Sequence, residues 1–160
     1  MMIGSSTIVG AQVSSASGSD TLVIGGIVSQ PLAVDAAALG KLDSTHFRVA
    51  DGAADSADFR GTLVWDLFKR AGIEADSARK GDNLRMILIA TGADGYSVIL
   101  AGAELIPEFA YTPAFVAVEM NRSALDKSRG MAELIVPGDR KHCRWVHQLV
   151  RLELRWTDTR

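Results

Sequence analysis

Alternation of apolar and polar side chains near the C-terminus constrains the fold of this chain more than any other feature. It spans residues 145–155, and neighbouring residues of a β-strand point to opposite faces of the sheet. One face would present Val146, Gln148, Val150, Leu152 and Leu154, and the other Trp145, His147, Leu149, Arg151, Glu153 and Arg155. The pattern therefore predicts a strand over 145–155 with its first face on a core.

Other segments of the chain are also typical of strands. They are residues 21–28, 46–50, 85–92, 95–101, 113–120 and 132–136. The ADG connection predicts a hairpin from 85 to 101, and the pair Gly25–Gly26 predicts a bulge. The segment 51–58 is acidic and aperiodic, which indicates a solvated loop.

Two short helices are predicted between these strands. Asp35 is expected to cap a helix over 35–42, and Thr62 to cap a helix that ends at Gly72. Because strands and short helices do not alternate strictly, the sequence predicts an α+β fold with mixed β-sheets and a few short helices.

The 160 residues predict one domain, and the 48% hydrophobic content is enough to build its core. No apolar run approaches the ~18 residues of a membrane span. Residues 1–19 are small and uncharged, which predicts a flexible leader or a signal-peptide remnant ahead of a domain at 20–160. A small-residue site at 14–16 would suit export to the periplasm, whereas the first basic residue is Lys41 and a signal peptide begins with a positive region, so a cytoplasmic location stays open as well.

Charge is spread unevenly along the chain. The net charge of −2 argues against a general nucleic-acid-binding protein. Residues 1–120 carry a net −6, whereas residues 121–160 carry a net +4. This basic last quarter indicates either a local site for an anion or a solvated basic face.

The ionisable side chains concentrate in the stretch VPGDRKHCRWVHQLVRLEL, residues 136–154. Its single cysteine, Cys143, excludes an intramolecular disulfide. Neighbouring Lys141, His142 and Arg144 would favour a reactive thiolate, whereas a thiol that pointed into the core would be inert. The histidines at 142 and 147 could donate to phosphate or carry protons, or lie half-buried with a structural hydrogen bond.

Five segments in order resemble one family. They are GIVSQPLAVDAAAL, FRGTLVWDLFKRAGI, ADGYSVILAGAEL, NRSALDKSRGMAELIVPGD and CRWVHQLVRLEL, and together they cover most of residues 21–155. The fourth resembles N-G-x-P-L-x-x-x-x-G-x-x-R-L-V-x-P-G-D and the fifth x-R-x-V-K-x-L-x-x-I-x-V. These are motifs of the molybdopterin-binding domain of sulfite-oxidase-like oxidoreductases.

The resemblance implies a sulfite-oxidase-like fold and a site for molybdopterin or another phosphorylated pterin. In that family, the turn after Pro-Gly and the Arg-x-Val-Lys strand hold the anionic groups of the cofactor. A guanidinium can bind phosphate oxygens in pairs, and a glycine lets the backbone approach closely. The expected site residues are therefore Gly138, Arg140, Lys141, His142, Arg144 and His147.

Two departures from the family pattern bear on function. His147 stands where the motif has lysine, and a neutral imidazole binds a dianion less well than an ammonium does. Residues 46–61 contain no cysteine, although the family's metal-ligating cysteine falls in this part of the domain. The sequence therefore predicts a non-catalytic pterin-binding protein without a metal ligand of its own. The alternatives are a molybdenum-dependent oxidoreductase and a periplasmic sensor or interaction module with a partner protein.

Overall fold

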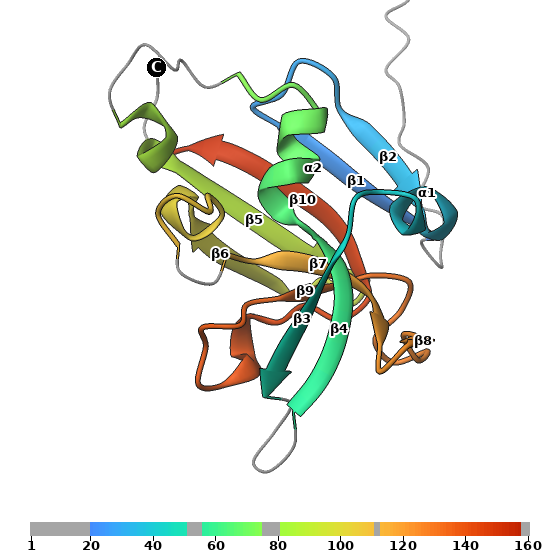
Figure 1. The fold of residues 1–160 in the computed structure, drawn as a ribbon. Coiled ribbons are helices and arrows are strands. Elements are labelled where there is room, and N and C mark those ends of the chain that lie inside the picture. The colour runs from blue at the N-terminus through green and yellow to red at the C-terminus, as the bar shows by residue number, and fades with distance from the viewer. Residues whose placement is uncertain (1–19, 51–55, 75–80, 111–112, 158–160) are drawn as a thin grey trace, which may run out of the picture.

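Two β-sheets form the framework of the described residues and share one hydrophobic core (Figure 1). The computed structural model describes residues 20–50, 56–74, 81–110 and 113–157. A few short helices connect the strands, so the predicted α+β class is confirmed. Within the described residues, no helix has the length and apolar character needed to span a membrane.

The first sheet has five strands: β1 (Thr21–Gly26), β2 (Leu32–Asp35), β5 (Met86–Gly92), β6 (Ser97–Ala101) and β10 (Leu149–Trp156). Their order across the sheet is β2-β1-β10-β5-β6. Strands β1 and β10 run parallel, and the other neighbours are antiparallel, so this sheet is mixed as expected. The predicted hairpin is the pair β5–β6.

The second sheet is built from β3 (Thr45–Ala50), β4 (Ser56–Leu63), β7 (Phe115–Met120), β8 (Ser123–Ala124) and β9 (Glu133–Ile135). Its order is β3-β4-β7-β8, and β9 also pairs with β7. All of these pairs are antiparallel. The loop interpretation of 51–58 is wrong for residues 56–58, which pair with β3, while 51–55 lie outside the described residues.

The helical elements are α1 (Ala36–Gly40), α2 (Val64–Arg70) and three short 3-10 turns, η1 (Asp82–Arg85), η2 (Gly102–Glu104) and η3 (His142–Arg144). Asp35 caps α1 as predicted, because its carboxylate accepts the amide N–H of Ala38 at 2.7 Å.

The predicted cap of α2 is wrong. Thr62 is a buried residue of β4, and its hydroxyl donates to the carbonyl of Asp43 at 3.1 Å. The helix begins one residue later than a Thr62 cap requires, with Leu63 in the capping position and no side-chain cap. Propensity favoured a hydroxyl cap, but the pairing of β4 with β7 extends through Leu63 and takes Thr62 into the sheet.

Aromatic rings join the second sheet to the loop that precedes β10. Phe47 and Phe115 stack with ring centroids 3.8 Å apart. Phe59 is fully buried and meets Phe115 and Trp145 edge to face, at 6.4 and 5.8 Å. The loop is therefore packed onto the core through Trp145.

The last strand is shorter than predicted. β10 begins at Leu149, because Gln148 has a positive φ of 47° and the pairing with β5 shifts between Leu149 and Arg151. This irregularity breaks the alternation, and Leu149 is buried although the pattern placed it opposite the core. Trp145, ahead of the strand, is also buried against the prediction. The prediction holds for Val146, Leu152 and Leu154, which are buried.

The Gly25–Gly26 pair ends β1 instead of forming a bulge inside it. Gly26 has φ of 92°, and a Cβ there would lie 2.0 Å from the carbonyl oxygen of Leu154. Only glycine allows the chain to leave the strand this close to β10.

Candidate functional site

The candidate site is the basic loop, which we define as residues 136–148 between β9 and β10. Three parts of the fold hold it. Phe59 of β4 packs against Trp145, the hydroxyl of Tyr96 donates to the carbonyl of Cys143, and Glu104 of η2 pairs with Arg144. Side chains from β4, from the turn between β5 and β6, and from η2 thus fix the position of the loop.

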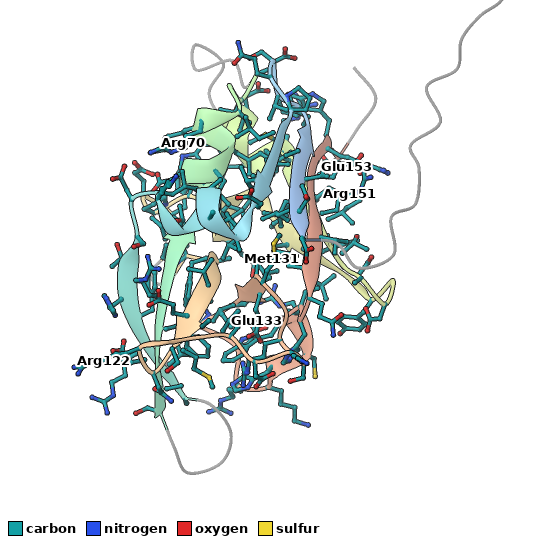
Figure 2. The ribbon with its side chains drawn as sticks, turned by 90° about the vertical axis from the view of Figure 1, so that its right-hand side faces the viewer. Arg70, Arg122, Met131, Glu133, Arg151 and Glu153 are labelled. Carbon is teal, nitrogen blue, oxygen red and sulfur yellow. The ribbon has the colours of Figure 1, made fainter. Side chains whose placement is uncertain are left out.

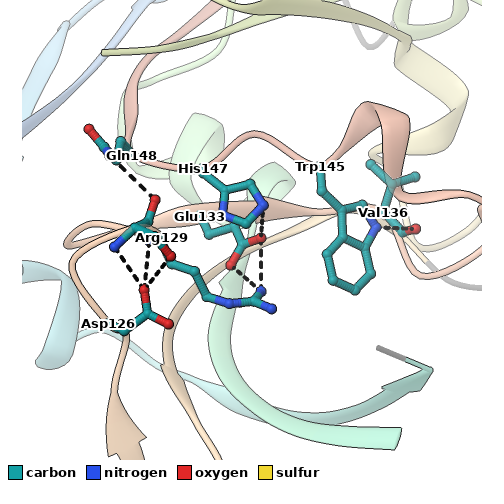
Figure 3. Close-up of polar contacts among 8 residues, drawn as sticks. Asp126, Arg129, Glu133, Val136, Trp145, His147 and Gln148 are labelled. Carbon is teal, nitrogen blue, oxygen red and sulfur yellow. Dashed lines mark hydrogen bonds and ion pairs between the residues drawn. The ribbon is translucent and has the colours of Figure 1, made fainter. Parts of the chain in front are cut away.

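Trp145 is the buried anchor of the basic loop. Its side chain is 3% exposed, and its indole N–H donates to the carbonyl of Val136 at 3.1 Å (Figure 3). The imidazole of His142 stacks flat on this indole, with ring centroids 3.6 Å apart and planes 10° from parallel. His142 is therefore half-buried, and its ring orientation is set by packing.

Arg144, the predicted anion donor with the best match to the family, is already engaged. Its Nε and Nη2 donate to the carboxylate of Asp139 at 2.9 and 2.6 Å, and its Nη1 donates to Glu104 at 2.7 Å. These bonds, with Asp139 contributing most, raise the pKa of Arg144. The guanidinium braces the basic loop against η2, and the two carboxylates offset its charge toward an anionic ligand.

Arg140 and Lys141 project from the same loop into solvent. Both side chains are exposed, and neither forms an ion pair with any residue that the structure describes. Gly138 is exposed next to Asp139, which leaves its backbone accessible. Gly138, Arg140 and Lys141 are thus all exposed on the basic loop. Cys143 is exposed beside them, so the inert core position is wrong for it.

A buried ion pair beneath the loop was not predicted from the sequence. Glu133 of β9 is fully buried, and Nη1 of Arg129 donates to both of its carboxylate oxygens, at 3.1 and 2.8 Å. Nε2 of His147 lies 3.5 Å from the same carboxylate (Figure 3). The Arg129 guanidinium also lies over the ring of Phe59, at 5.7 Å. His147 therefore sits over a carboxylate and is half exposed.

One signal in the sequence could have revealed this pair. Glu133 interrupts the apolar run AELIV, and a charge in a buried strand needs a partner of opposite charge. Arg129 precedes it by four residues. In the family motif the position of Glu133 is an arginine and that of His147 is a lysine. The chain therefore differs from the motif in charge at two positions whose side chains are in contact here.

The turn that carries Arg129 is organised by Asp126. Its Oδ1 accepts the N–H and the hydroxyl of Ser128 at 2.8 and 2.5 Å, and the N–H of Arg129 at 3.1 Å. These bonds, led by the Ser128 hydroxyl, lower the pKa of the Asp126 carboxyl.

We expect Ser128→Ala to raise the titration midpoint of Asp126 toward its ordinary value of 3.8. Because the folded pKa is depressed, the contribution of Asp126 to stability is present above this value and is lost as the pH falls through the folded pKa. An NMR titration of the carboxyl carbon measures the midpoint. Ser123→Ala, in β8, is the control and should leave it unchanged; an equal midpoint in both variants would contradict the assignment.

A groove of about 250 Å³ adjoins the C-terminal end of the basic loop. Gln148 and Leu149 form one side of it, and Lys127, Gly130 and Met131 contribute to the rest. Ligand pockets usually enclose ~300–1,000 Å³, so this groove has room for part of a small molecule only. In Figure 2 Met131 is labelled near the middle of the view, with Glu133 below it.

One further histidine, His46, lies outside this loop. His46 is exposed on β3, with its Nδ1 3.5 Å from the carboxylate of Asp58. Within the described residues, no group of three or more His, Cys, Asp or Glu side chains could hold a metal ion. The exposed guanidinium of Arg140 and ammonium of Lys141 are donors of the type that binds phosphate, whereas residues 46–61 supply no thiolate at the family's position.

Comparison with known proteins bears on the fold. No protein-family model matches the chain, and no curated protein sequence matches it. Its fold is similar to that of the sulfane dehydrogenase SoxCD from Paracoccus pantotrophus, with a TM-score of 0.68. The match covers 91% of this chain but 40% of that one, at 19% sequence identity. At this identity the likeness shows the fold alone, and it agrees with the predicted α+β architecture.

Proposed function

We propose that this chain binds a molybdopterin-like pterin or another phosphorylated small molecule at residues 137–147, without catalysing a reaction itself. The observation that carries the proposal is the exposure of Arg140 and Lys141, which have no ion-pair partner among the described residues. They lie on a loop whose other cation, Arg144, is held by two carboxylates.

The contacts that hold the basic loop also fix the backbone from which the exposed cations project. Arg144 ties the loop to Glu104, Trp145 anchors it in the core, and Tyr96 holds the carbonyl of Cys143. A positioned guanidinium and ammonium lose less conformational freedom on binding than the same groups on a mobile loop. Arg140 binds phosphate oxygens in pairs and Lys141 acts as a point charge, while the backbone at Gly138 can approach the ligand closely.

The proposal that the chain is not catalytic rests on residues 46–61, where the family has its metal-ligating cysteine. Residues 46–61 contain no cysteine, and the one cysteine of the chain lies instead in η3. A bound pterin cofactor would supply redox chemistry only with its metal. The residues of this chain bind and orient the phosphate end.

Pyrophosphate is a suitable first probe, measured by calorimetric titration. We expect the double variant Arg140→Ala/Lys141→Ala to bind it at least ~10-fold more weakly than the unmodified protein, because each charged hydrogen bond contributes ~1.5–3 kcal/mol. Lys69→Ala/Arg70→Ala is the matched control, since it removes an adjacent exposed Lys and Arg from α2. Equal weakening in both variants would indicate general charge attraction and would overturn the proposed site.

The second test is chemical analysis of protein purified from its own source. Oxidised pterin fluorescence after acid release, with no stoichiometric molybdenum or tungsten, supports a binding protein for a pterin. Stoichiometric metal together with pterin would overturn the non-catalytic part of the proposal and favour the oxidoreductase alternative.

A further inference from the structure

The exposed large hydrophobic side chains gather along one edge of the molecule. In the described residues they are Leu84, Tyr96, Ile99 and Phe109, each between 46% and 59% exposed. Tyr96 directly precedes β6, and Ile99 is the central residue of this strand. Phe109 comes after η2, the turn that follows β6. Leu84 lies in η1, which packs against η2. Figure 1 shows β6 on the outside of the first sheet, with η1 and the coil after η2 on the same side.

β6 is an edge strand without the usual protection. Its sequence, SVILA, contains no charge and no proline, although edges of soluble proteins normally carry one or the other. The other edges differ: β2 contains Asp35, β3 contains His46 and Arg48, and β8 is two residues long. Among the described strands, β6 therefore presents the edge best suited to pair with another strand.

The hydrogen bond of Ala101 shows which groups of β6 face outward. Its N–H donates to the carboxylate of Glu104 at 2.8 Å and so points away from β5. In an antiparallel ladder, alternate residues direct both backbone groups to the same side. Ile99 and Ser97 therefore also direct their N–H and C=O groups away from β5. The Glu104 carboxylate occupies the N–H of Ala101, whereas the outward N–H and C=O groups of Ile99 and Ser97 stay available for pairing with another strand.

We propose that β6 pairs with β6 of a second copy of this chain, antiparallel and about a two-fold axis at Val98. In that register Ser97 lies opposite Ile99 of the second copy, and Ile99 lies opposite its Ser97. The four open N–H and C=O groups of each chain then all find partners. The occupied amide of Ala101 is not required.

A second copy fits this edge better than an unrelated peptide for two reasons. The open groups belong to two residues placed symmetrically about Val98, which is the arrangement that an isologous contact requires. The strand is also neutral, so antiparallel self-pairing brings no like charges together. The two Ile99 side chains meet diagonally across the axis, beside Ile89, which is the partner of Ile99 in β5.

Sedimentation over a concentration series tests the pairing. The unmodified protein is expected to form a dimer, and Ile99→Lys to weaken it at least ~10-fold, because two ammonium groups would then face each other across the axis. Ile99 is 59% exposed, so the monomer should tolerate lysine. Ala33→Lys is the control, because Ala33 is exposed on β2 at the opposite edge of the same sheet.

Amide hydrogen exchange on the unmodified protein provides a test that needs no variant. The amides of Ser97 and Ile99 should become protected as the concentration rises. A monomer at every concentration, with both amides exchanging freely, would overturn the proposal. So would a dimer that Ile99→Lys and Ala33→Lys weaken equally. Pyrophosphate binding should be the same for Ile99→Lys and the unmodified protein, which separates this contact from the proposed ligand site.

Discussion

Arg129→Ala is expected to lower the free energy of unfolding by about 3–5 kcal/mol. The Arg129 side chain is 13% exposed and its carboxylate partner, Glu133, is fully buried. Removing the guanidinium takes the bidentate partner away from a charge that cannot reach water. The same change removes the cation that lies over Phe59. Denaturant unfolding at neutral pH measures the loss.

The double variant Arg129→Met/Glu133→Leu separates the cost of an unpaired charge from the loss of packing. Apolar residues that replace both members of a buried pair are often neutral or stabilising, so most of the stability should return. Lys69→Ala breaks the exposed ion pair with Asp66 and serves as a surface control, with an expected loss below ~1 kcal/mol. If Arg129→Ala cost no more than Lys69→Ala, the buried pair would not stabilise the fold as proposed.

Phe59→Ala is expected to cost about 3–5 kcal/mol in the free energy of unfolding. Phe59 is fully buried and contacts the rings of Phe115 and Trp145, so its removal leaves a cavity where the second sheet meets the basic loop. Because Trp145 loses one wall of its pocket, we also expect a shift in tryptophan fluorescence on mutation, before any unfolding.

Phe109→Ala makes the same chemical change at a side chain that is 57% exposed. At concentrations where the protein is monomeric it should alter stability by ~0.5 kcal/mol or less. Phe59→Leu keeps part of the volume and should fall between the two. Similar losses in the free energy of unfolding for Phe59→Ala and Phe109→Ala would show that the packing around Phe59 does not contribute to stability as expected.

Sequence patterns predicted the elements that depend on local signals. Asp35 capped its helix, the ADG turn made its hairpin, and Leu152 and Leu154 faced the core. The errors occurred where tertiary pairing decided the outcome. Thr62 belongs to the sheet because β7 pairs with β4 up to Leu63. The left-handed backbone at Gln148 shifted the register of β10, and no residue type at that position announces it.

The candidate site shows the same division between local and tertiary information. The concentration of cations in residues 140–144 was visible in the sequence, and Arg140 and Lys141 are exposed as a site for an anion requires. The neutralisation of Arg144 was not visible, because Glu104 lies 40 positions away in the chain. A count of charges cannot tell which cations already have carboxylate partners, and this depends on the fold.

The position of β10 has a consequence for how the chain is made. It comes after all the other described strands in the chain, yet it lies in the middle of the first sheet, parallel to β1 and antiparallel to β5. Until it emerges from the ribosome, the β1–β2 and β5–β6 hairpins each lack their inner neighbour and expose an unpaired edge. Such long-range closure slows folding and leaves the nascent chain prone to aggregate. Cellular yield should therefore depend on chaperones that shield these hairpins until β10 pairs with them.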